Sequence, residues 1–153
     1  MSTQRTKIWG TPMWTFIHTF TVKVNEVFFI RNIQNIINIM DIVIDCIPCD
    51  YCKSHALKYI KKNNMKQIKN KQQFIDYFVT FHNEVNKQLG KQSFGLDTNN
   101  VYSRNNIWIT VVTMYKMVVS RRTSSKNMLD AIYRKERMMN VVKFVKEHTH
   151  YLS

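Results

Sequence analysis

The residues best suited to chemistry are the three cysteines, which all lie within one short window of the chain. Cys46, Cys49 and Cys52 form two overlapping C-x-x-C pairs. Pro48 predicts a helix that begins there, with Cys49 in its first turn and Cys52 just beyond, on the same side of the helix. Unpaired amides and the positive helix end favour the thiolate, which is the reactive form of cysteine. The spacing therefore predicts a redox-active dithiol, Cys49/Cys52.

Two other interpretations of this cluster stay open. With His55 the three cysteines read C-x-x-C-x-x-C-x-x-H, a set of soft ligands for zinc, and the cysteines alone resemble part of an iron–sulfur motif. Structural zinc sites usually join two distant ligand pairs, which a single compact cluster does not do. The third interpretation is that the cysteines are buried and act as small hydrophobic side chains.

A second polar motif lies at 82–91, toward the end of an amphipathic segment. His82 and Asn86 are four residues apart, and so are Asn83 and Lys87, which places them in neighbouring stripes of a helix. Histidine and asparagine offer donors and acceptors for a heterocycle, and Lys87 and Lys91 can neutralise a pyrophosphate. A polar patch on a surface helix is the simpler explanation of the same residues.

The elements that position these motifs are predicted to be helical. The chain has 153 residues but only three glycines and two prolines, too few for the turns of an all-β fold. Periodicity and capping signals predict helices beginning at Thr11-Pro12 and covering about 31–45, 49–62, 71–89, 107–121 and 125–148. Asn70 with Gln73 resembles a capping box, and Gly90 is the expected C-cap.

The charge of the chain is strongly positive. The formal net charge is +13, and seven lysines with no acidic residue lie between Asp50 and Asp76. This balance indicates either an anionic partner or a solvated basic surface. No secretory signal and no apolar run of transmembrane length is recognised, so we expect no transmembrane segment.

Three segments together resemble the motifs of one protein family. W-G-T-P-M-W-T-F-I-H at 9–18 resembles its opening W-G-x-x-x-W-x-x-I/L-H segment, and P-C-D-Y-C at 48–52 resembles its P-C-x-x-C active site. H-N-E-V-N-K-Q-L-G-K at 82–91 resembles its FAD-binding signature, H-N-x-V-N-x-x-L-x-K. The family is the Erv/ALR family of FAD-linked sulfhydryl oxidases. The three motifs occur in family order and at family spacing, over about Trp9 to Phe94.

The resemblance implies a fold, a cofactor and a reaction. The fold would be all-α, a four-helix bundle that holds FAD at one end, often as a homodimer, with added C-terminal helices. Cys49 would exchange with the thiols of a protein dithiol, and Cys52 would lie beside the flavin in a charge-transfer contact. Oxygen would then take the electrons and give hydrogen peroxide. The positions that match the family's FAD contacts are Gly10, Trp14, His18, His82, Asn83, Val85, Asn86, Lys87 and Lys91.

The chain also departs from cellular members of that family. It has no cysteine outside 46–52, so it lacks a second structural disulfide and a shuttle C-x-x-C. Small oxidases of large DNA viruses show the same economy, which implies a viral origin and a location in the host cytoplasm or virion. A thioredoxin-like relay protein is the expected kind of substrate, and neither a metal nor a nucleic-acid partner is expected. The alternative function is a zinc-binding helical module that contacts nucleic acid.

The remaining residues lie outside the family pattern. The bundle is predicted to occupy 1–100, and 101–153 is predicted to be a basic helical extension that packs on or near it and serves an oligomer or partner interface. Trp108 aligns loosely with a late aromatic near the family's flavin site. Cys46 has no place in the pattern, and we expect it to be inert.

Overall fold

The computed structural model describes residues 3–93, 101–120 and 128–153, with side chains from residue 8 onward. All regular secondary structure within these residues is helical, which confirms the all-α class. The α-helices are α1 (Thr3–Lys23), α2 (Glu26–Arg31), α3 (Ile33–Asp45), α4 (Asp50–Lys62), α5 (Lys71–Gln88), α7 (Ile107–Val119) and α8 (Met128–Glu147). Two short 3₁₀ turns, η1 (Met65–Gln67) and η2 (Thr149–Tyr151), complete the described elements.

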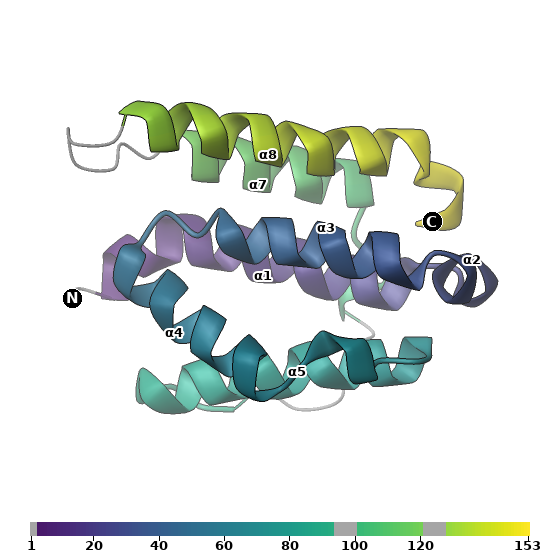
Figure 1. Cartoon of the computed structure of the whole chain (residues 1–153), viewed down its shortest axis with the longest axis horizontal. Coiled ribbons are helices and arrows are strands. Elements are labelled where there is room, and N and C mark those ends of the chain that lie inside the picture. Colours follow the sequence, from purple (N-terminus) through teal and green to yellow (C-terminus); the bar gives the residue numbers. More distant parts are fainter. Residues whose placement is uncertain (1–2, 94–100, 121–127) are drawn as a thin grey trace.

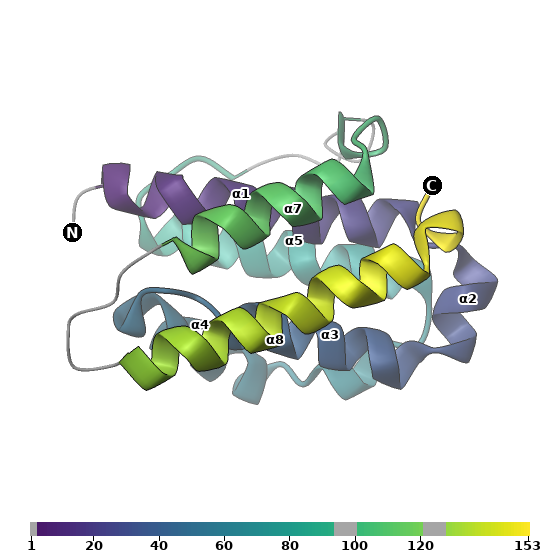
Figure 2. The same cartoon turned by 90° about the horizontal axis from the view of Figure 1, so that it is seen from above.

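The helices are stacked in layers, as Figure 1 shows. α4 and α5 form one outer layer, α1 and α3 the middle, and α7 and α8 the other outer layer. α1 packs against α5 on one side and α7 on the other, while α8 packs against α7 and α3. Figure 2 shows the first half of α8 passing beside the connection between α3 and α4. The C-terminal helices therefore reach the segment that carries the cysteines.

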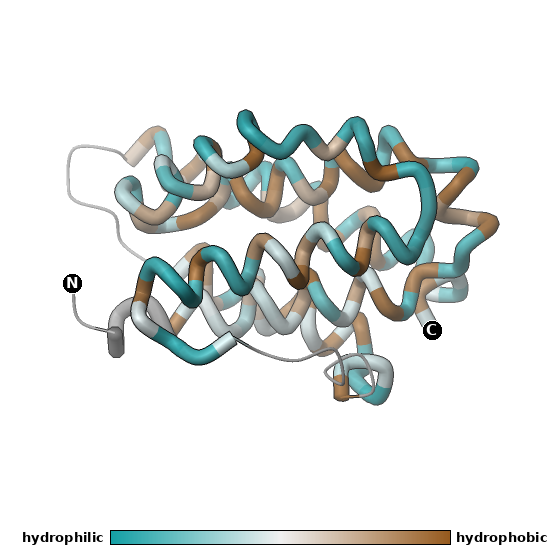
Figure 3. Tube along the Cα trace, turned by 90° about the horizontal axis from the view of Figure 1, so that it is seen from below, coloured by the Kyte–Doolittle hydropathy of each residue, from teal (hydrophilic) through white to brown (hydrophobic). Residues whose placement is uncertain are grey.

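One continuous hydrophobic core runs through these layers. Its aromatic part is built from fully buried phenylalanines of α1, α2 and α5, of which Phe29 and Phe74 stack with ring centroids 4.8 Å apart. Val111, Met114, Met138, Val141 and Val145 extend the same core into α7 and α8. Figure 3 shows the alternation of hydrophobic and hydrophilic residues along the helices that makes this packing possible. The division into 1–100 and 101–153 stays a prediction.

The start of the first helix differs from the prediction. α1 begins at Thr3, and Pro12 lies inside it instead of at its first position. A proline there removes one amide donor and crowds the carbonyl of the preceding turn. Trp9 and Met13, one turn apart, are both buried on the core side. Their packing holds the helix continuous through the proline, which local sequence signals do not register.

The start of α4 also differs. Pro48 precedes the helix instead of occupying its first position, and Cys49 is the N-cap residue, outside the first turn. The short helix α2, which the sequence analysis missed, is only six residues long and begins at the cap Asn25. A helix that short lacks enough turns for its apolar repeat to be recognised.

The boundaries of α5 follow the predicted signals. The Asn70 side chain accepts a hydrogen bond from the Gln73 amide at 2.8 Å. The Gln73 side chain in turn accepts from the backbone amide of Lys69, whereas in a capping box it would accept from that of Asn70. Gly90 follows the helix with φ of +68°. The amides of Gly90 and Lys91 donate to the carbonyls of Lys87 and Asn86, which is the Schellman arrangement. This ending sets the position of Lys91 relative to the last turn of α5.

None of the helices in the described ranges combines the length and the apolar character needed to cross a membrane.

The packing of α8 can be tested with two neighbouring methionines. Met138 is fully buried in the shared core, whereas Met139 is 46% exposed. We expect Met138→Ala to lower the free energy of unfolding by about 2–4 kcal/mol, because it leaves a cavity between α8 and its neighbours. Met139→Ala, the matched control, is expected to change it by less than about 0.5 kcal/mol. Denaturant unfolding measures both values, and equal effects would mean that α8 does not pack as described.

Candidate active site

The N-terminus of α4 brings Cys49 and Cys52 together. The Cys49 sulfur caps the helix and accepts a hydrogen bond from the Cys52 amide at 3.2 Å. Both side chains are half-buried, and both are free thiols. Helix N-termini favour negative charge, because their amides point outward and the helix dipole is positive there. The pair therefore has the proximity of a disulfide-forming dithiol, although Cys49 reaches it as a cap and not as a first-turn residue.

A cavity of about 290 Å³ lies beside Cys52, between α1, α4 and α5. Cys52, Ala56 and Tyr59 line it from α4, and Tyr102 lines it from the segment before α7. Trp9, Gly10, Met13, Trp14, Ile17, Phe81, His82, Val85, Asn86 and Lys91 are among its other lining residues. Cys49 is not among them. The two cysteines therefore differ in place, since one borders the cavity and the other lies at the helix end outside it.

Three rings form a stack across α1 and α5. Trp14 and His82 are nearly parallel, with an interplanar angle of 5° and ring centroids 4.1 Å apart. His18 Nε2 lies 2.9 Å from His82 Nδ1, so one imidazole donates a hydrogen bond to the other. His18 also stacks on Trp14 and contacts the Tyr102 ring. Trp14 and His82 also line the cavity, so the stack forms part of one wall of it.

Both histidines of the stack stay neutral at physiological pH. Burial, and the charge of His82, lower the pKa of His18 to about 3. Burial and the neighbouring Lys91 lower the pKa of His82 to about 4. Only one proton can occupy the line between Nε2 of His18 and Nδ1 of His82, and neutral imidazoles meet that requirement. This part of the wall therefore carries no positive charge.

Burial raises the pKa of two of the thiols, and for Cys52 it outweighs the helix end that was expected to favour the thiolate. Burial first, and then the contact with Cys49, raise the pKa of Cys52 to about 12. The Cys52 thiol of the reduced pair therefore keeps its proton. Burial raises the pKa of Cys46 to about 11, and its sulfur lies 3.8 Å from the Arg134 carbonyl oxygen of α8. Cys46 is thus enclosed between α3 and α8, away from the cavity.

The structure places most of the expected cofactor-binding residues around one cavity. Gly10, Trp14, His82, Val85, Asn86 and Lys91 line it, together with Cys52. His18 lies behind His82, whereas Asn83 and Lys87 do not line the cavity, and Lys87 is exposed. The roles of all of these residues stay predictions.

Tyr102 is a lining residue that the sequence analysis missed. It lies between the predicted helices 71–89 and 107–121, where no apolar repeat predicts which side chains face inward. Burial raises the pKa of its phenol, so its hydroxyl is neutral beside the cavity. Trp108, the aromatic expected near the site, is 39% exposed on α7 and does not line the cavity.

The residues around the cavity fit FAD. Flat neutral rings suit a planar heterocycle, the buried Asn86 side chain offers a donor and an acceptor, and Lys91 at the rim suits a phosphate. The volume is near the lower end for ligand pockets, so the cavity matches the flavin ring system better than the whole cofactor. The Cys52 sulfur borders the space that the ring system would occupy.

A shared metal site has no geometric support among the described residues. No group of three or more histidine, cysteine, aspartate or glutamate side chains gathers there as metal ligands would. Cys46 contacts the α8 backbone, whereas Cys52 and His55 border the cavity. The C-x-x-C-x-x-C-x-x-H sequence does not converge on one point, because Cys46 lies before the α4 N-terminus and is covered by α8.

The chain is similar in sequence to known proteins whose names fit this site. Residues 11–109 match the Erv1/Alr family. An African swine fever virus protein named FAD-linked sulfhydryl oxidase is 27% identical over 84 residues, covering 55% of this chain and 70% of that protein. The putative FAD-linked sulfhydryl oxidase 347L of Invertebrate iridescent virus 6 is 30% identical over 55% of this chain and 81% of that protein.

A plant relative shows the same likeness outside viruses. The FAD-linked sulfhydryl oxidase ERV1 of Arabidopsis thaliana is 31% identical over 56% of this chain and 44% of that protein. No solved structure matches the chain. The family match covers more than half of the sequence and includes both cysteines of the dithiol and the 82–91 motif. Viral relatives agree with the predicted viral character, and the chain belongs to the Erv1/Alr family.

Proposed function

We propose that this protein oxidises protein dithiols through a Cys49–Cys52 disulfide, with FAD in the cavity between α1, α4 and α5 and oxygen as the final electron acceptor. The observation that carries the proposal is the placement of the two sulfurs. Cys52 borders the cavity, whereas Cys49 caps α4 outside it. One thiol can therefore face the cofactor while the other meets the substrate. The relatives named FAD-linked sulfhydryl oxidases support the same chemistry.

The reaction at the dithiol begins with the disulfide form of the pair. A substrate thiolate attacks Sγ of Cys49, and the new S–S bond forms as the Cys49–Cys52 bond breaks with its electron pair on the Cys52 sulfur. The second substrate thiolate then attacks the substrate sulfur that is bonded to Cys49. This closes the substrate disulfide and releases Cys49 as a thiolate. In the cavity, FAD would supply the two-electron acceptor for the reduced pair, and the two electrons with two protons would go on to oxygen as hydrogen peroxide.

The surrounding residues position this reaction. The Trp14–His82 stack and its hydrogen bond to His18 hold one wall of the cavity in a fixed orientation. Burial raises the pKa of Cys52, so its thiol must lose a proton when the disulfide re-forms. The Cys52 amide, which donates to Cys49, keeps the two sulfurs close between turnovers.

The partners and the location are part of the same proposal. A protein dithiol such as a thioredoxin-like relay protein is the proposed substrate, and the proposed assembly is a homodimer. The viral relatives support a setting in the host cytoplasm or the virion. Gel filtration with light scattering tests the dimer, and anaerobic reduction by a thioredoxin-like protein tests the substrate class.

Cysteine variants test the assigned roles directly. We expect Cys52→Ser to keep the yellow flavin absorbance but to lower dithiol-dependent oxygen consumption by at least roughly a hundredfold, because no thiol then borders the cavity. Cys49→Ser should lower it similarly, because the substrate loses the sulfur it attacks. Visible absorbance and an oxygen electrode provide both measurements.

The third cysteine is the matched control. Cys46→Ser is expected to keep the turnover of the wild-type protein on a protein dithiol, because Cys46 is buried against α8 and its pKa is raised. Substantial turnover in Cys49→Ser or Cys52→Ser would contradict the assigned pair. A large loss in a folded, flavin-loaded Cys46→Ser variant would instead make Cys46 part of the relay.

The neutral histidine pair predicts a pH dependence of stability. His18 and His82 have folded pKa values of about 3 and 4, below the unfolded value near 6.5. The unfolded chain therefore binds more protons below pH 6.5, and stability is lost as the pH falls from there toward 4. The free energy of unfolding should drop by up to about 1.4 kcal/mol per pH unit for each histidine.

A glutamine variant separates this effect from other titrations. His18→Gln removes one of the two groups and should reduce the slope of unfolding free energy against pH between about 6 and 4.5. His150→Gln, at an exposed position, should leave that slope unchanged. Identical slopes in all three proteins would show that the pair does not remain neutral on folding.

A further inference from the structure

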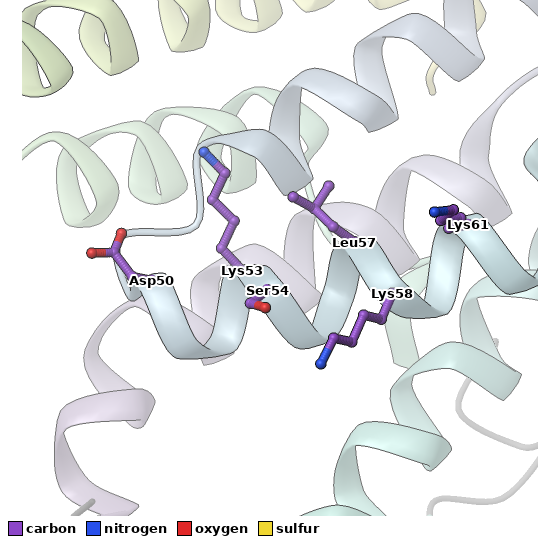
Figure 4. Close-up of a pocket in the computed structure, with 6 residues that line it drawn as sticks. All are labelled: Asp50, Lys53, Ser54, Leu57, Lys58 and Lys61. Atoms are coloured by element: carbon purple, nitrogen blue, oxygen red, sulfur yellow. The ribbon is translucent and has the colours of Figure 1, made fainter.

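The outer face of α4 carries a basic groove that the dithiol chemistry leaves unused. It is a shallow hollow of about 360 Å³ lined by Asp50, Lys53, Ser54, Leu57, Lys58 and Lys61, here called the α4 groove. Figure 4 shows these side chains along the outside of the helix. Leu57 is 44% exposed and supplies an apolar surface between the lysines. The groove thus combines positive charge with an apolar contact.

The groove begins at the reactive end of the helix. Each lining residue has another one three or four positions along the chain, so together they form a single stripe that starts directly after Cys49. Lys61 is twelve residues beyond Cys49, which corresponds to about 18 Å along the helix. An extended polypeptide covers that distance with about five or six residues. A peptide with its cysteine at Cys49 can therefore lie along the stripe.

The charge is unevenly distributed along the groove. Near Cys49, Lys53 forms an ion pair with Asp45 at 3.1 Å, and Asp50 adds a carboxylate. Farther along, Lys58 and Lys61 lie within ion-pair distance of no carboxylate in the described part of the chain. The uncompensated positive charge therefore lies at the far end, which gives the groove a direction.

We propose that the α4 groove is the docking surface for an acidic segment of the substrate protein that flanks its dithiol. Lys58 and Lys61 attract the acidic residues, Leu57 contacts an apolar side chain among them, and the substrate cysteine is aimed at Cys49. This inference rests on the proposed function, because it concerns which dithiols reach that site. Charge complementarity of this kind raises the association rate and sets the orientation of the partner.

The groove fits a polypeptide better than other anionic partners. Among the described residues that line it none is aromatic, so it offers no platform on which nucleic-acid bases could stack. An exposed leucine within a single helical stripe suits one extended chain. The position beside Cys49 also requires a partner that carries a thiol, which is a property of a protein substrate.

Matched peptides test this proposal. Two synthetic peptides carry the same Cys-x-x-Cys dithiol, followed by a run of glutamates in one and a run of glutamines in the other. We expect the wild-type, flavin-loaded protein to oxidise the glutamate peptide with a kcat/KM about fivefold higher, the effect of two exposed charge pairs. The ratio should approach one in the double variant Lys58→Gln/Lys61→Gln, and it should fall with added salt in the wild type.

A second double variant controls for net charge. Lys66→Gln/Lys69→Gln removes the same charge from exposed lysines outside the groove and should keep the wild-type ratio. Turnover of the glutamine peptide establishes the oxidase function separately, so a loss of selectivity is distinguishable from a loss of activity. Equal kcat/KM for both peptides in the wild type would overturn the proposal, as would the same loss of selectivity in both double variants. If the protein showed no peptide selectivity but bound phosphatidylserine vesicles or single-stranded RNA in a way that depends on Lys58, the proposal would be overturned in favour of that partner.

Discussion

The contact on which the site depends is the stack of Trp14 and His82, with His18 hydrogen-bonded behind it. It joins α1 to α5 at the cavity and fixes both the separation and the orientation of the two helices there. The histidines must be neutral to share one proton, and burial ensures this by lowering both pKa values. A charged imidazolium beside the cavity would repel cations and attract anions, whereas the neutral stack does neither. Cys52 on α4 closes the cavity from another side, so three helices must pack correctly before the thiol and the wall meet.

Much of this arrangement could be predicted from the sequence, because its determinants are local. The Asn70 cap, the Gly90 ending and the apolar repeats of α3 and α5 each depend on neighbouring residues. The differences between the predicted and the observed structure have causes in the tertiary packing. Pro12 lies inside α1 because Trp9 and Met13 pack on either side of it, and Tyr102 reaches the cavity from outside the predicted helices. The motifs identify the residues that gather near the cavity. They do not show which motif residues stay at the surface, as Lys87 does.

The segment before the dithiol is held without a disulfide. Asp45, at the end of α3, contacts Lys53 of α4 at 3.1 Å and Arg137 of α8 at 3.2 Å. Nε of Arg137 is buried and makes no hydrogen bond of good geometry, so its approach to Asp45 is an ion contact. Such pairs add little stability, but they fix the register of the elements they join. Cys46, beside Asp45, is covered by the α8 backbone. The C-terminal helices therefore act on the site through the position of the α3–α4 connection.

The two faces of α4 explain how one short helix can serve both half-reactions. Cys52, His55, Ala56 and Tyr59 recur at helical spacing and line the cavity, whereas Lys53, Leu57, Lys58 and Lys61 form the outer stripe. Cys49 is the N-cap residue at the end of the helix from which both stripes begin. In the proposed reaction, a substrate on the outer face would meet Cys49, while Cys52 would face the cofactor on the other side of the helix. The sulfur pair would then carry the electrons from one face to the other, because the two cysteines are three residues apart at the helix end.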